Sequence, residues 1–103
     1  MNTKSLYAVL FILSMLAGVL QANGDPDRGR ELSIICQDCH GADGLGDEDI
    51  PQIAGLEEDY IVEQLQDFAS GERVDEQELM GMIVEDLSEQ DMADLAAYFT
   101  ALN

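Results

Sequence analysis

The sequence contains few basic residues and few side chains of the kind that carry acid–base catalysis. Of its 103 residues, four are lysine or arginine and 22 are aspartate or glutamate, which gives a formal net charge of −18 at pH 7. This balance disfavours binding to nucleic acids or to an anionic membrane surface, because both carry negative charge themselves. A single histidine also leaves the chain without the usual general base if that residue has another role. We therefore expect no catalytic residues and no enzyme activity.

Cysteine is equally scarce, and both cysteines belong to one short motif. The segment Cys36-Gln37-Asp38-Cys39-His40 contains the two cysteines and the one histidine of the sequence. This C-x-x-C-H pattern is typical of a covalent c-type haem attachment site. Two thiols at this spacing reach neighbouring vinyl groups of one porphyrin, and the next residue offers a neutral imidazole nitrogen to the iron. The motif predicts one haem c, bound through Cys36 and Cys39.

Three other interpretations of a C-x-x-C pair fit the sequence less well. A structural zinc site needs four ligands, and only three cysteine and histidine residues exist. A thioredoxin-type redox pair needs strands around it, and no stretch of the sequence alternates as a strand should. A plain disulfide between Cys36 and Cys39 closes too small a loop to stabilise a fold much, and it leaves His40 unexplained.

A long apolar run is confined to the N-terminal part of the chain. Residues 6–20 are almost wholly apolar, Lys4 precedes them, and small residues follow at Ala22 and Gly24. This layout predicts a secretory signal peptide over residues 1–24, with cleavage after Ala22 as the alternative. A membrane anchor needs about 20 apolar residues, so the run is short for one. We expect a soluble protein in an oxidising periplasm, without a stable membrane anchor.

The remaining domain, residues 25–103, is small and very acidic. Three arginines oppose all 22 acidic residues there, which gives a net charge of −19. A chain of this length is near the limit for a domain held by its own core, and a bound haem would supply further apolar contact. The charge favours redox partner proteins with a basic docking face, through long-range attraction that salt weakens. General solubility is the alternative explanation of the charge.

Apolar periodicity and capping signals predict an all-α domain. The signals for the first helix are Asp25 as its cap, Pro26 at its first position, and Gly29, where a helical glycine indicates close approach of another element. The loop 41–55 is rich in glycine, residues 73–77 are polar and predict a turn or loop, and Ser88 to Asp91 resembles a capping box. The second predicted helix has Gly71 just past its end and one apolar stripe, made by Ile61, Leu65, Phe68 and Ala69. We expect helices over residues 26–36, 57–69 and 89–101, and one or two helical turns within 79–87.

A low-spin haem iron needs a second axial ligand, and the sequence offers few candidates. No second histidine exists, and no lysine follows the predicted signal peptide. Met92 lies on the apolar stripe of the last predicted helix, where a core position is favoured. Met80 and Met82 lie in the short segment before that helix. The residue pattern leaves Met80, Met82 and an open iron site as alternatives.

Nearly all of the chain after the predicted signal peptide resembles one family. The blocks that carry the resemblance are, in order, Cys36-x-x-Cys39-His40-Gly41-Ala42-Asp43-Gly44, Pro51-x-Ile53-Ala54-Gly55, Gln64-Leu65-x-x-Phe68-x-x-Gly71-x-Arg73, Met80, and Leu87-Ser88-x-x-Asp91-x-x-x-Leu95-Ala96-x-Tyr98-Phe99. This set is similar to the class I c-type cytochromes, especially small bacterial periplasmic monohaem cytochromes and the single domains of tandem dihaem ones.

The resemblance implies a fold and a set of haem ligands. In such a fold three to four short helices surround one covalently attached haem, and the first and last helices cross, here near Gly29 and Phe99. His40 would be the proximal iron ligand, and the carbonyl of Pro51 would accept the hydrogen bond of its other ring nitrogen. Met80 would be the distal ligand, with Met82 as runner-up.

The resemblance also implies a single-electron carrier that uses haem c with His/Met ligation. One electron would enter and leave through an exposed haem edge, and no bond to a substrate would form. A cytochrome subunit of a periplasmic oxidoreductase, for example one that oxidises a sulfur compound, is the alternative. A ligand-binding haem sensor would instead have an open sixth iron position.

Overall fold

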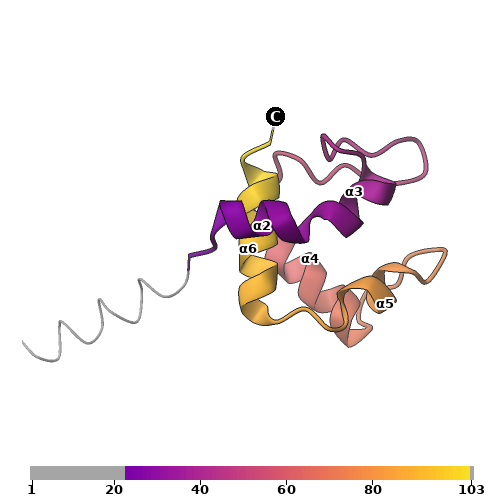
Figure 1. Cartoon of the computed structure of the whole chain (residues 1–103). Helices are drawn as coiled ribbons and strands as arrows, with labels where there is room; N and C mark the ends of the chain where they lie inside the picture. The colour runs from indigo at the N-terminus through magenta and orange to yellow at the C-terminus, as the bar shows by residue number, and fades with distance from the viewer. Residues whose placement is uncertain (1–22, 103) are drawn as a thin grey trace, which may run out of the picture.

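The computed structural model describes residues 23–102, and the predicted signal peptide lies outside this range apart from its last two residues. The described part of the chain is helical and contains no strand, which confirms the all-α prediction. None of its helices is long and apolar enough to cross a membrane. Its helices are α2 (Pro26–Leu32), α3 (Ile34–His40), α4 (Glu58–Ser70), α5 (Met80–Val84) and α6 (Glu89–Thr100) (Figure 1).

The predicted first helix, 26–36, is in fact two helices that meet at Ser33. Ser33 is fully buried, and its hydroxyl donates a hydrogen bond to the carbonyl of Arg30 at 2.7 Å. The side-chain amide of Gln37 donates in turn to the Ser33 hydroxyl oxygen at 2.8 Å. A serine hydroxyl that binds nearby backbone groups competes with the regular helical ladder, which accounts for the break. Beyond the break, Ile35 is 54 % exposed.

The other helix ends follow their predicted signals closely. Asp25 caps α2 by accepting hydrogen bonds from the two N–H groups of Asp27 and Arg28. Helix α4 ends at Gly71, which adopts the left-handed conformation with φ of 85°. Helix α6 begins with a complete capping box, in which Ser88 and Asp91 each bind the other's backbone N–H at 3.0 Å. These local contacts satisfy backbone groups that helix ends otherwise leave free.

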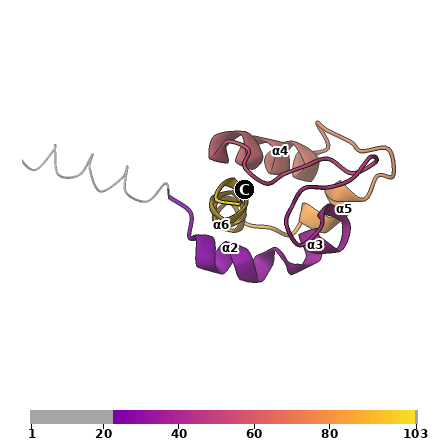
Figure 2. The same cartoon turned by 90° about the horizontal axis from the view of Figure 1, so that it is seen from above.

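Helix α6 is the central element of the fold. Figure 2 views it along its axis, with α2 on one side and α4 on the other. Its buried residues Leu95, Ala96 and Phe99 form the core together with Ile61 of α4. Partly buried apolar side chains from α2, α3, α4, α6 and the segments between and after them surround this cluster, namely Leu32, Cys36, Ile53, Leu56, Val62, Leu65, Leu87, Tyr98 and Leu102. The core therefore ties the first, middle and last helices together.

The crossing of α2 and α6 depends on glycine. A Cβ atom at Gly29 would lie 1.9 Å from the carbonyl oxygen of Asp94 and 2.9 Å from the Cβ of Tyr98. Gly24 packs in the same way, because its Cβ would lie 2.0 Å from the carbonyl oxygen of Ala93. The predicted close approach at Gly29 is confirmed. Its partners are Asp94 and Tyr98, whereas Phe99 packs into the core.

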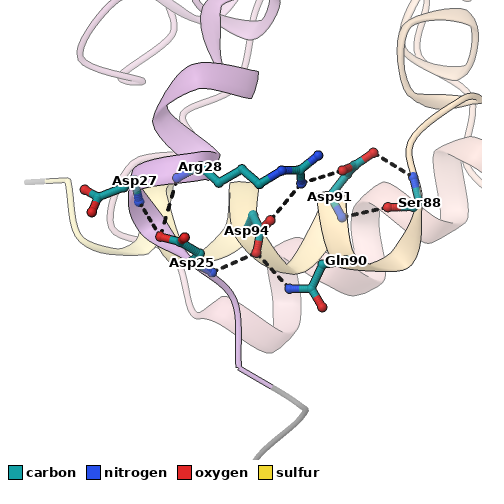
Figure 3. A network of polar contacts seen from close by, with 7 residues as sticks. All are labelled: Asp25, Asp27, Arg28, Ser88, Gln90, Asp91 and Asp94. Atoms are coloured by element: carbon teal, nitrogen blue, oxygen red, sulfur yellow. Dashed lines mark hydrogen bonds and ion pairs between the residues drawn. The ribbon is translucent and has the colours of Figure 1, made fainter.

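A buried carboxylate reinforces this crossing (Figure 3). The Asp94 side chain is 1 % exposed and accepts hydrogen bonds from the backbone N–H of Asp25 at 2.7 Å and from Gln90 at 2.8 Å. The Arg28 guanidinium pairs with Asp94 at 2.8 Å and with Asp91 at 2.6 Å. The charge of Asp94 is therefore paired and fully hydrogen-bonded, as a buried charge must be. Two of its three donors, Asp25 and Arg28, come from the distant N-terminal end of the domain, and the third, Gln90, lies one turn earlier on α6.

These contacts also decide the ionisation of Asp94. Burial by itself raises the pKa of this carboxyl, because the charged form loses water. The hydrogen bonds from Asp25, Arg28 and Gln90 favour the charged form and outweigh burial, so the pKa of Asp94 lies below its usual value. Asp94 is thus an ionised carboxylate at neutral pH.

Candidate functional site

The candidate site lies on the side of the molecule away from the α2–α6 crossing. Figures 1 and 2 both show α3, α5 and the loop 41–55 on this side, at the right of each view. Helix α3 carries the two cysteines and ends at His40, and helix α5 begins at Met80. The fold therefore brings the haem-attachment motif and the methionine segment to one side of the domain.

The two cysteines lie on one face of α3 because residues three apart on a helix are neighbours. Cys36 is partly buried against the core, and Cys39 is exposed. Burial raises the pKa of the Cys36 thiol to about 11, because the thiolate would be poorly solvated. Before haem is attached, Cys36 would therefore be a thiol at neutral pH, and the pair has the adjacent placement that attachment to one porphyrin requires.

His40 is the last residue of α3 and is 6 % exposed. Its Nδ1 lies 2.8 Å from the carbonyl oxygen of Pro51. A carbonyl oxygen accepts hydrogen bonds and donates none, so Nδ1 carries the hydrogen and Nε2 keeps its lone pair. This is the tautomer and the hydrogen bond that a metal-binding histidine uses. The structure thus places Pro51 and His40 together and leaves Nε2 able to bind iron.

The loop that carries Pro51 is held against α3 by backbone contacts. The N–H of Gly46 donates to the carbonyl of His40 at 2.8 Å, and the N–H of Asp47 donates to the carbonyl of Ile50 at 2.8 Å. Gly46 has a φ of 68°, and a Cβ there would lie 2.1 Å from the carbonyl oxygen of Ile50 and 2.7 Å from that of Pro51. A glycine is required at this place, because the loop doubles back on itself to present the Pro51 carbonyl to His40.

The two candidate methionines on α5 point in different directions. Positions two apart on an α-helix are separated by about 200°, so Met80 and Met82 cannot share a face. Met82 is 69 % exposed and borders a shallow surface hollow together with Phe68, Val74 and Glu85. Met80 is partly buried and is not part of that hollow. The predicted core position of the third candidate, Met92, is confirmed, because Met92 is 4 % exposed in the core.

Asp75 is a residue at this site that sequence reasoning missed. Its carboxylate accepts hydrogen bonds from the backbone N–H groups of Leu79 at 3.2 Å and Met80 at 3.0 Å. Residues 73–77 read only as a polar turn in the sequence. The one local signal is an aspartate a few residues before a short helix, which is a common capping arrangement.

The described residues contain no group of three or more histidine, cysteine, aspartate or glutamate side chains placed to hold a metal ion. The donors that the fold does present are one imidazole nitrogen and one or two thioether sulfurs. Histidine and methionine are the axial ligands of haem iron in electron-transfer cytochromes. The residues present therefore fit a haem c.

Comparison with known proteins also identifies a c-type cytochrome. The family model described as Cytochrome c matches residues 26–103. Cytochrome c4 of Pseudomonas aeruginosa is 38% identical over 99 residues, which cover 95% of this chain and 48% of that protein. The structure of cytochrome c4 of Acidithiobacillus ferrooxidans superposes with a TM-score of 0.71 and 31% identity, covering 78% of this chain and 51% of that one. The cytochrome subunit of sulfide dehydrogenase of Chlorobaculum tepidum is 36% identical over 76 residues, covering 74% of this chain and 67% of that subunit.

The fold and the attachment motif together define a c-type cytochrome domain of class I. The chain belongs to the cytochrome c family. It spans about half the length of the cytochrome c4 relatives that it matches, so it is similar to one half of those proteins. Domains of this family bind covalently attached haem c, and Cys36, Cys39 and His40 provide the C-x-x-C-H motif here.

Proposed function

We propose that this protein is a single-electron carrier with one haem c, attached to Cys36 and Cys39 and ligated by His40 and Met80. The observation that carries the proposal is the 2.8 Å contact between His40 Nδ1 and the Pro51 carbonyl. This contact leaves Nε2 of a histidine that directly follows the attachment cysteines available to bind the iron. Haem iron supplies a one-electron couple between Fe(III) and Fe(II).

The residues of the chain then act by holding positions and not by forming bonds to a substrate. The hydrogen bond to Pro51 keeps the His40 ring in one orientation and one tautomer in both oxidation states. A thioether ligand from Met80 raises the reduction potential and closes the iron to small molecules. Met80 stands eight residues before Ser88, as the ligand methionine of the class I cytochromes stands before their Leu-Ser-x-x-Asp helix start, and this position supports Met80 as the ligand.

The charge of the described domain supports redox partners with a basic docking face. Three arginines oppose 22 acidic residues after residue 24, and one of the three, Arg28, is paired with Asp91 and Asp94. Little positive charge is left to offset the acidic surface, so a basic partner is attracted at long range and salt weakens the attraction. We place the protein in a periplasm, with residues 1–24 as signal peptide and 25–103 as the haem domain.

Two measurements on the exported protein test the proposal. A mass increase equal to one haem that survives denaturation, together with the absence of free thiols, is expected because Cys36 and Cys39 become thioethers. The exchange Met80→Ala is expected to alter the oxidised absorption spectrum and to permit carbon monoxide binding in the reduced state, with Met82→Ala as the matched control. A spectrum unchanged by Met80→Ala but changed by Met82→Ala would reassign the ligand. A haem already open to carbon monoxide in the wild type would indicate a ligand-binding protein.

A second candidate function is a subunit of a periplasmic oxidoreductase. It is favoured by the likeness to the cytochrome subunit of sulfide dehydrogenase, which covers most of this chain. A carrier is expected to elute as a monomer on size exclusion and to be reduced by several donors. A dedicated subunit is expected to co-elute with one larger redox protein at physiological salt.

A further inference from the structure

We propose that Asp75 is a positioning residue that fixes the start of α5 and thereby the orientation of Met80. The inference rests on the proposed role of Met80 as an iron ligand. Three successive backbone N–H groups bind Asp75: that of Glu78 donates to its carbonyl oxygen at 3.0 Å, and those of Leu79 and Met80 donate to its carboxylate at 3.2 and 3.0 Å. Asp75 thus accepts a hydrogen bond from the backbone of Met80 and of each of the two residues before it.

Helix α5 needs such support because it is only five residues long. An isolated helix of this length does not form in water, since its nucleation cost is never recovered. The residue at its N-cap position, Leu79, makes no side-chain hydrogen bond to the helix. The carboxylate of Asp75, four residues before Leu79, caps the helix instead by accepting the hydrogen bond of the Leu79 N–H. Its negative charge lies next to the positive end of the helix.

The turn between Asp75 and Met80 also holds an unfavourable backbone conformation. Glu78 has a φ of 58°, and it is the one non-glycine residue with positive φ among residues 23–102. Residues with a Cβ avoid this conformation unless the surroundings impose it. The hydrogen bonds to Asp75 from Glu78 itself and from the two residues after it supply that constraint. Strain of this kind, two residues before a proposed ligand, is typical of functional sites.

The two ends of α5 are held by different means. At its C-terminal end Val84 is 1 % exposed and anchors the helix by packing. At its N-terminal end Leu79 is 49 % exposed and Met80 only partly buried, so the hydrogen bonds to Asp75 provide most of the restraint there. Removing the Asp75 carboxylate is therefore expected to free Met80 without unfolding the domain. A freed Met80 in a domain that stays folded would distinguish a positioning role of Asp75 from a general contribution to the free energy of unfolding.

The test is competition for the iron in the oxidised holoprotein, with imidazole as the probe and absorption as the readout. Loss of the hydrogen bonds in Asp75→Ala is expected to lower the apparent dissociation constant of imidazole on the order of tenfold. Asp75→Asn keeps an amide oxygen as acceptor and is expected to fall between Asp75→Ala and the wild type. The matched control is Glu76→Ala, which removes the same charge from the exposed neighbouring position and is expected to stay within about twofold of wild type.

The helical circular dichroism of each variant is followed in urea alongside the imidazole titration. Equal imidazole affinity in Asp75→Ala and Glu76→Ala would overturn the inference, even if Asp75→Ala lowered the urea midpoint. If Asp75→Ala does not accumulate with haem, Asp75→Asn takes its place in the comparison. Equal imidazole affinity in Asp75→Asn and Glu76→Ala would then overturn the inference. Met80→Ala separates the two proposals: if it leaves imidazole affinity unchanged, the ligand assignment itself fails. If Met80→Ala raises the imidazole affinity while both Asp75 variants match Glu76→Ala, the ligand assignment stands and only the positioning role of Asp75 is refuted.

Discussion

Replacing Gly29 by alanine tests the close contact of α2 and α6 directly. The new methyl group would lie 1.9 Å from the Asp94 carbonyl oxygen, whereas contacts under 3.0 Å are essentially never seen. The two helix backbones must therefore separate by roughly 1 Å or more, which also strains the Arg28–Asp94 pair and the packing of Tyr98. Overpacking costs about 1–3 kcal/mol and sometimes more, and alanine gains about 1 kcal/mol in helix propensity. A backbone overlap lies at the upper end, so we expect a net loss of about 2–3 kcal/mol.

The assay is urea unfolding of the oxidised holoprotein, followed by far-ultraviolet circular dichroism. The matched control is Gly71→Ala, because a Cβ there meets nothing within 4 Å and only the positive φ of 85° is unfavourable. That control is expected to lose about 1 kcal/mol. The midpoint should shift with an unchanged slope, since the same surface is exposed on unfolding. A loss for Gly29→Ala no greater than that of Gly71→Ala would refute the role given to the helix contact.

Two further changes test local and long-range polar contacts. Ser88→Ala removes one half of the α6 capping box and is expected to lower the free energy of unfolding by about 1 kcal/mol, with the exposed Ser70→Ala as control. Because the folded-state pKa of Asp94 lies below the value of about 3.9 in an unfolded chain, its contribution is complete above that pH and is lost as pH falls through the folded value. Urea unfolding of the wild type from pH 7 to pH 2 should thus show a loss of stability below about pH 4 that is smaller in Asp94→Asn. Identical pH profiles would show that Asp94 does not contribute.

The features that the sequence predicted correctly are local ones. A cap, its partner three residues later and a terminal glycine lie within one turn of the chain, so Asp25, Ser88 and Gly71 could be assigned from residue type alone. Apolar spacing likewise predicted Ile61 and Phe68 on the inner face of α4. The haem-attachment motif is also a local feature, because its chemistry fixes the spacing of residues that are close together in the sequence.

The features that were missed depend on contacts between distant segments or on competition within a turn. The break at Ser33 arises because a buried hydroxyl binds the backbone, and serine is equally common at exposed positions where it does not. The pairing of Arg28 with Asp94 joins residues 66 apart, and nothing in a chain with 22 acidic residues marks one of them as buried. The role of Asp75 requires the left-handed conformation of Glu78, which residue type disfavours.

The sequence also could not choose between Met80 and Met82 from periodicity alone. A helix of five residues completes little more than one turn, so an apolar stripe has no room to repeat. The difference in exposure between the two residues comes from how α5 packs on the end of α4, which is a tertiary contact.

The helix crossing at Gly29 has a consequence for the order in which the domain assembles. It joins the two ends of the domain, as the hydrogen bond between Asp25 and Asp94 spans 69 residues of sequence. Closing so long a loop is costly in entropy, and contacts of large sequence separation form slowly. A haem tethered to α3 and ligated from α5 would divide that loop into shorter ones. Attachment should therefore hasten folding as well as stabilise its product, and shorten the time for which a newly made chain is open to proteolysis.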